Sequence, residues 1–168
     1  IAILICLNYL IVNGQDEAHW LRYPSISPDG STIAFSYHGN LYYADADGGN
    51  AVAITTGDAY DGYPVWSHDG NTIAFASDRH GNFDVYTIPA KGGTPIRLTF
   101  NSANDYPNDF TIDNKSVLFG SGRDAPAQSV RFPSPRLFKN LYTVPVQGGR
   151  PVLVTAAGAE NAKYNSDG

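Results

Sequence analysis

The chain has 168 residues, of which 42% are hydrophobic and 16% charged, with a formal net charge of −5 and a pI near 5.1. Such a composition argues against disorder, and the length allows one domain with a sizeable core. Lysines and arginines are scattered singly, so the sequence provides no basic surface that would bind nucleic acid or an anionic membrane.

The N-terminal residues 1–12 form an uncharged, mostly apolar run, IAILICLNYLIV. This run is shorter than the roughly 20 residues of a membrane-spanning helix. Val12 and Gly14 stand at positions −3 and −1 before Gln15, which predicts that residues 1–14 are part of a cleaved secretory signal peptide. Export to the periplasm or the cell exterior follows, and retention of the run as a membrane anchor stays open. Ile5 is not the small residue that a lipoprotein signal needs before Cys6, so we expect neither lipidation nor, after cleavage, any disulfide.

After a polar lead-in, residues 15–22, the chain repeats itself. Residues 23–55 and 63–99 match nearly position for position, with Gly30 and Gly70 40 residues apart. In the second repeat, four short runs rich in β-branched and aromatic residues (65–67, 72–77, 83–89 and 95–99) are separated by turn clusters. Residues 106–155 are a looser third copy, and a fourth begins near residue 162.

Repeats of roughly 40 to 45 residues with four strands each are typical of β-propeller blades. The predicted fold is all-β: a propeller of three four-stranded blades plus the start of a fourth, with 23–168 as its domain. We interpret the chain as a fragment of a longer protein. An open stack of blades leaves faces unpaired, so we expect it to be poorly soluble alone.

The third repeat is interrupted between its second and third strands by residues 121–140. This stretch contains three prolines and is the most basic part of the chain. Proline prevents further sheet pairing, which favours a loop on one rim of the propeller. A solvated loop explains it more simply than a dedicated binding site.

Acidic turns recur once per repeat. Asp followed by Gly or Asn caps its own turn and is followed by a residue that tolerates positive φ, so we interpret these residues as turn formers and not as ligands. They are Asp29, Asp69, Asp113 and Asp167. The DADGG run at 45–49 resembles the start of a calcium loop, but Thr56 stands where the closing Glu is needed, and we reject a calcium site.

The recurring aromatic residues predict packing between blades. Trp66 and Phe110 occupy matching positions with Ile26 and are expected to form a core stripe. The tyrosines that recur at the start of each repeat are expected to pack blade on blade; they are Tyr23, Tyr63, Tyr106 and Tyr164. The histidines show no metal-ligand spacing and are expected to be exposed in loops. They are His19, His38, His68 and His80.

Known catalytic patterns are missing from the sequence: there is no Gly-x-Ser-x-Gly elbow, no phosphate loop and no His-Glu-x-x-His helix. We therefore assign no catalytic, cofactor-binding or metal-binding residue, and we expect no cofactor. Any enzymatic activity is expected to reside elsewhere in the parent protein.

The Ser-Pro-Asp-Gly-x-x-Ile-Ala-Phe run, followed by Gly-Gly and Leu-Thr, resembles the PD40 or TolB-type propeller repeat, a WD40-like pattern. The stretch LRYPSISPDG at 21–30, with RFPS at 131–134 and LYTVPVQGGRP at 141–151, is similar to the N-terminal propeller of exported tricorn-protease-like serine peptidases of the S41 class. This resemblance covers almost all of the chain from Trp20 onwards.

The resemblance implies a non-catalytic propeller that gates or sorts peptides for a C-terminal serine peptidase domain, whose catalytic positions lie beyond Gly168. Peptide or protein substrates are then the expected partners, through the parent enzyme. Two alternatives stay open: a TolB-like envelope propeller that binds proteins, and the propeller of a prolyl-oligopeptidase-type peptidase. Since propellers serve several functions, the repeat alone does not choose among them.

Overall fold

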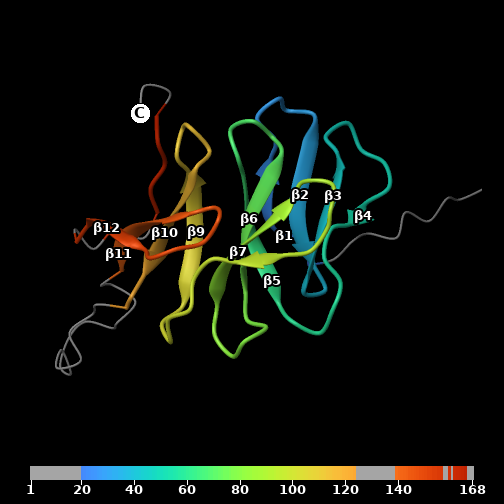
Figure 1. Cartoon of the computed structure of the whole chain (residues 1–168). Coiled ribbons are helices and arrows are strands. Elements are labelled where there is room, and N and C mark those ends of the chain that lie inside the picture. The colour runs from blue at the N-terminus through green and yellow to red at the C-terminus, as the bar shows by residue number, and fades with distance from the viewer. Residues whose placement is uncertain (1–19, 124–138, 157–158, 160, 166–168) are drawn as a thin grey trace, which may run out of the picture.

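The computed structural model describes residues 20–123, 139–156, 159 and 161–165. Their strands form three four-stranded antiparallel sheets, one after another along the chain (Figure 1). The first sheet, blade 1, contains β1 (Arg22–Ile26), β2 (Thr32–Tyr37), β3 (Asn40–Asp45) and β4 (Val52–Ala53). Blade 2 contains β5 (Asp61–Trp66), β6 (Thr72–Ser77), β7 (Asp84–Pro89) and β8 (Ile96–Arg97). Blade 3 contains β9 (Asp105–Phe110), β10 (Ser116–Ser121), β11 (Asn140–Pro145) and β12 (Val152–Thr155).

The predicted fold class is confirmed: the molecule is all-β, and its sheets are propeller blades. Strand order within each blade follows the chain. The first strand of each blade contacts the first strand of the next, β1 with β5 and β5 with β9. We call the edge that these three strands form the inner edge of the blades. The predicted signal peptide (1–14) lies outside the described residues, as do residues 124–138 of the interruption. The interruption does fall between the second and third strands of blade 3, because Ser121 pairs with Asn140.

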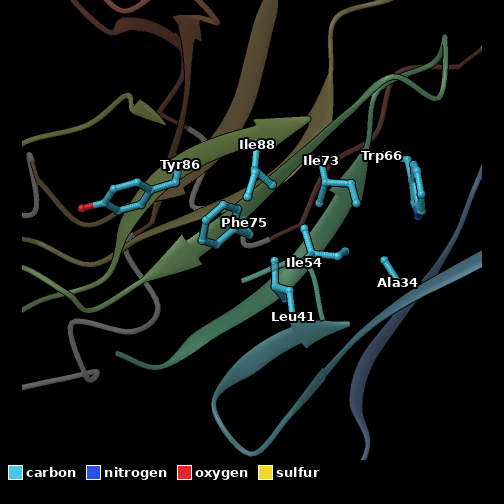
Figure 2. Close-up of a cluster of buried hydrophobic side chains, with 8 residues drawn as sticks. All are labelled: Ala34, Leu41, Ile54, Trp66, Ile73, Phe75, Tyr86 and Ile88. Carbon is cyan, nitrogen blue, oxygen red and sulfur yellow. The ribbon is translucent and has the colours of Figure 1, made fainter. Parts of the chain in front are cut away.

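Alternation of side chains along the strands builds two cores, one between each pair of neighbouring blades. On β6, Ile73 and Phe75 point toward blade 1, while Ala74 points toward blade 3. Figure 2 shows the first core, in which Ala34 and Leu41 of blade 1 face the larger side chains of blade 2. A blade buried on both faces therefore needs apolar residues at successive positions, as TIAFAS provides.

The predicted core stripe is only partly correct. Trp66 and Phe110 are buried, and the Trp66 indole Nε1 donates a hydrogen bond to the Ser25 carbonyl, 3.0 Å away. The expectation for Ile26 is wrong, because this side chain is 59% exposed. Trp66 and Phe110 each pack against the preceding blade, whereas no blade among the described residues packs on the corresponding face of β1.

The predicted role of the acidic turns is confirmed for the three that the structure describes. Asp29 Oδ1 accepts hydrogen bonds from Ser27 Oγ at 2.6 Å and from the Ser31 backbone at 3.1 Å. Blades 2 and 3 repeat this arrangement. In blade 3, Asn114 takes the glycine position with φ of 57°, which asparagine tolerates. Asp167 lies outside the described residues.

These hydrogen bonds hold the turn carboxyls in the charged form. The hydroxyl of Ser27, followed by the Ser31 backbone and hydroxyl, lowers the pKa of Asp29 to about 2. The Ser67 and Thr111 hydroxyls likewise lower the pKa of Asp69 and Asp113.

Among the described residues, no helix has the length and apolar character needed to cross a bilayer.

Candidate functional site

The inner edge of the blades carries a repeated Tyr-Pro pair. β1, β5 and β9 each have a register shift, and in β1 and β5 the extra residues are Tyr-Pro. Tyr23 and Tyr63 adopt φ of 53° and 56°, a left-handed conformation that costs a tyrosine roughly 1–2 kcal/mol. The proline that follows has no N–H, which suits a strand edge without a neighbour. The bulge therefore turns the tyrosine ring out of the regular alternation.

Blade 3 builds its inner edge differently from the sequence prediction. Gly120 pairs with Tyr106, whereas the corresponding Ala76 pairs with Gly62. Tyr106 is therefore the counterpart of Gly62 and not of Tyr63, and its φ is not positive. In β5 the bulge consists of Tyr63 and Pro64, whereas in β9 the extra residue follows Pro107. An alignment on the Tyr-Pro pair therefore misplaces Tyr106 by one position.

Three of the rings nevertheless form one continuous row, which confirms blade-on-blade packing for Tyr23, Tyr63 and Tyr106 and leaves it a prediction for Tyr164. Tyr63 stacks on Tyr23 with ring centroids 3.9 Å apart, and its other side meets Tyr106 at 4.9 Å. Burial, followed by a hydrogen bond with Tyr23, raises the pKa of the Tyr63 hydroxyl well above its usual range. Phe83 and the Lys139 ammonium lie against Tyr106, at 5.4 Å and 4.9 Å from its ring. We call Tyr23, Tyr63 and Tyr106 the tyrosine row.

The lack of a side chain at Gly62 leaves room for the Tyr23 and Tyr60 rings beside it. A Cβ at this position would lie 3.2 Å from a Tyr60 ring atom and 3.3 Å from a Tyr23 ring atom, which is closer than ordinary packing.

Beside the row, a hollow of about 250 Å³ is lined by Pro24, Pro64 and Asn108, and by Lys163 from the segment that follows blade 3. That segment is fixed by the Tyr164 N–H, which donates to Asp109 Oδ2 at 2.9 Å. The inner edge thus presents aromatic and proline surface, with Lys139 against Tyr106 and Lys163 in the lining of the hollow.

The rim next to the row is held by buried ion pairs that sequence reasoning missed. Arg79 donates to both carboxylate oxygens of Asp61, at 2.9 and 3.1 Å, and Arg123 donates to Asp105 at 2.6 Å. Each guanidinium also lies over two aromatic rings of its own blade. Arg97 makes a third such pair with Asp84, at 2.6 Å. The repeated spacing of Asp61 and Asp105, matched by that of Arg79 and Arg123, was the signal available in the sequence.

Two of the histidines behave as predicted. His38 and His80 are exposed in loops, while His19 lies outside the described residues. His68 is exposed but has a structural role that the prediction lacked: its ring Nε2 is 3.0 Å from the Phe110 carbonyl, and its backbone N–H donates to Asn114 Oδ1 at 2.7 Å. This histidine therefore links blade 2 to blade 3.

Comparison with known proteins agrees with this geometry. Residues 18–168 match the family model of the tricorn protease N-terminal β-propeller domain. The chain belongs to this family. A tricorn protease homologue of Streptomyces coelicolor is 34% identical over 103 residues, which are 61% of this chain and 10% of that protein. This member of the tricorn propeller family therefore spans only a small part of the length of that relative.

Solved structures show the same fold at low sequence identity. The putative TolB from Agrobacterium tumefaciens superposes with a TM-score of 0.64 and 23% identity, over 81% of this chain and 48% of that one. The tricorn protease superposes with a TM-score of 0.56 and 16% identity, over 74% of this chain and 13% of that one. At these identities the similarity establishes the propeller fold and leaves function to the site.

Proposed function

We propose that this propeller is a non-catalytic domain of an exported serine peptidase of the tricorn type, and that it sorts peptide substrates for a catalytic domain elsewhere in the parent protein. The observation that carries the proposal is the tyrosine row on the inner edge of a chain that belongs to the tricorn propeller family. Aromatic and proline surface of this kind suits an extended peptide, which brings apolar side chains and a polar backbone together.

The tyrosine row also has the rigidity that sorting requires. Tyr63 is held between two other rings, and its backbone is fixed by the bulge. A surface that keeps its shape discriminates among peptides by fit, at little cost in ordering its own side chains. The prolines beside it leave few backbone N–H groups at the edge, so a passing peptide is not captured as an added strand.

The test uses the full-length parent peptidase with Tyr63→Ala. Hydrolysis is compared for a long unfolded peptide and for a short fluorogenic peptide with the same cleavage site. If the propeller sorts substrates, kcat/KM for the long peptide relative to the short one changes several-fold in the variant. An unchanged ratio, with the variant still folded, would remove the sorting role. Reading the gene through its 3′ end tests the catalytic partnership itself. A stop after the last blade would contradict the partnership, and a Gly-x-Ser-x-Gly elbow would contradict the tricorn type in favour of a prolyl-oligopeptidase-type enzyme.

Export is tested by isolating the protein from the cell envelope or medium of its host and sequencing its N-terminus. The proposal expects mature chains that begin at Gln15, as the predicted cleavage site requires. Chains that keep residues 1–14 and stay with the membrane fraction would favour an anchor instead.

A further inference from the structure

The hollow beside the tyrosine row is lined by one proline from each blade and by two of the tyrosine rings. Its volume of about 250 Å³ is below the roughly 300–1,000 Å³ of pockets that enclose a whole small ligand, so it suits one or two residues of a longer chain. The rings are those of Tyr23 and Tyr63, and the prolines are Pro24, Pro64 and Pro107. The hollow therefore offers rigid aromatic and aliphatic rings in one surface shared by three blades.

Two polar groups at the hollow are hydrogen-bond donors. The hydrogen bond with Tyr23 raises the pKa of the Tyr63 hydroxyl, so Tyr63 is its donor and Tyr23 its acceptor. The Tyr23 hydroxyl therefore keeps its own proton for another acceptor. Lys163 adds an ammonium group, which has three donors and no acceptor, while the amides of Asn108 and Asn161 can do either. An occupant that brings acceptors is therefore favoured.

The strands at this edge offer an incoming chain few N–H groups. Each of β1, β5 and β9 has a proline directly after its tyrosine, and proline has no backbone N–H. A strand that adds to a sheet edge needs N–H and C=O partners along that edge. A polyproline II segment does not, because it makes no internal hydrogen bonds and keeps its backbone open to the surroundings. This extended conformation is the one that matches the inner edge.

We propose that the hollow binds a proline-rich peptide segment in the polyproline II conformation, with the Tyr23 hydroxyl donating a hydrogen bond to a peptide carbonyl. Grooves that recognise such segments are lined by aromatic side chains. Charge complementarity supports this occupant, since a prolyl segment carries carbonyl acceptors and no N–H, whereas Tyr23 and Lys163 are donors. The segment is already extended before it binds, which keeps the entropic cost low. The inference rests on the proposed function, because it names the class of peptide that the inner edge sorts.

The experiment measures equilibrium binding to the full-length parent protein by fluorescence anisotropy, so it needs no peptidase activity. The two probes are hexaproline peptides with a neutral coumarin label at the N-terminus and an amidated C-terminus, one of L-proline and one of D-proline. They have the same composition, and neither has a charged end. The D-peptide forms the mirror-image helix, so the L-peptide should bind at least about tenfold more tightly. This comparison needs no variant, so it does not depend on whether a substitution disturbs folding.

A pair of variants assigns the binding to the hollow. Tyr23→Phe removes the hydroxyl and keeps the ring, so the L-peptide should bind about 2- to 12-fold more weakly, the effect of one net hydrogen bond. The matched control is Tyr43→Phe, the same change in blade 1 at a tyrosine that does not line the hollow, and it should leave the affinity unchanged. The thermal unfolding midpoint checks that both variants are folded.

Equal affinity for the L- and D-peptides, or an equal effect of the two variants, overturns the inference. The sorting test on Tyr63 compares a long with a short substrate, neither of which needs a run of prolines. It can therefore succeed where the hexaproline experiment fails, and the two proposals fail separately.

Discussion

The buried Asp105–Arg123 pair allows a sharp test of what holds the rim together. The change is Arg123→Met, which removes the charge but keeps an apolar chain over Phe119 and Tyr142. The Asp105 side chain is 0% exposed, so the variant leaves a carboxylate buried without its counter-ion. Breaking a buried pair in this way costs about 3–5 kcal/mol, a large part of the roughly 5–15 kcal/mol that stabilises a typical domain. The matched control is Lys115→Met, whose pair with Asp113 is exposed and contributes about 0–1 kcal/mol.

The pH dependence of this loss identifies its cause. Burial, as the largest effect, raises the pKa of Asp105 above its ordinary value, although Ser121 and Arg123 pull it down. A carboxyl whose folded pKa is raised binds its proton more tightly in the folded state. Its contribution to stability is therefore most favourable at low pH and declines as pH rises from the unfolded pKa, about 3.9, through the folded pKa. Removal of Arg123 raises the folded pKa further.

We therefore expect the deficit of Arg123→Met to be largest at pH 7 and to shrink as pH falls toward 4. Urea denaturation at 25 °C, followed by tryptophan fluorescence at several pH values, measures it. If Arg123→Met and Lys115→Met lost equal stability, or if the deficit were independent of pH, the reasoning from an uncompensated buried carboxylate would be refuted.

Three further outcomes follow from the turns and the tyrosine row. Gly62→Ala should lower the free energy of unfolding by about 1–3 kcal/mol through overpacking against two rings, while Gly122→Ala, with open space at its Cβ, should change it little in the same urea titration. Asp29→Asn combined with Asp69→Asn should flatten the loss of stability in acid. Their lowered pKa values give stability that is present above the unfolded pKa near 3.9 and is lost as pH falls through the folded pKa, about 2 for Asp29. Tyr63→Gly should be more stable than Tyr63→Ala by about 1 kcal/mol in thermal unfolding, because both lose the ring but only glycine tolerates the left-handed backbone; the reverse order would contradict the strain.

Local turn chemistry made the fold predictable. The strand predicted at 72–77 is β6 to the residue, because it lies between a turn that requires Gly70 and a polar loop. The first strand of blade 2 was predicted too short, starting at Val65 where β5 starts at Asp61. The bulge explains the error: Tyr-Pro reads as the end of a strand, since proline and a residue with positive φ both interrupt regular pairing.

The site was harder to predict because its parts are joined across blades. The contact between Tyr63 and Tyr106 requires the register of two different sheets, and a repeat alignment by residue type shifts Tyr106 by one position. The buried pairs join the start of a first strand to the loop after a second strand, a distance that periodicity within one strand does not reveal. The sequence signal for these pairs is a correlation between repeats: the Asp and the Arg occur together in blades 2 and 3, and both are missing from the matching positions of blade 1.

This correlation separates structural residues from residues available for binding. Where a polar pair recurs in successive blades and is buried, the fold itself explains it, as for Asp61 with Arg79. Where one blade drops the pair and places a charged residue at a position that is glycine in its neighbour, stability does not require the charge. Arg22, which takes the position of Gly62, is such a residue. In a repeat protein, comparison of the blades shows which residues the fold itself requires, because every blade has the same fold. A residue type found in one blade only is therefore a candidate for binding.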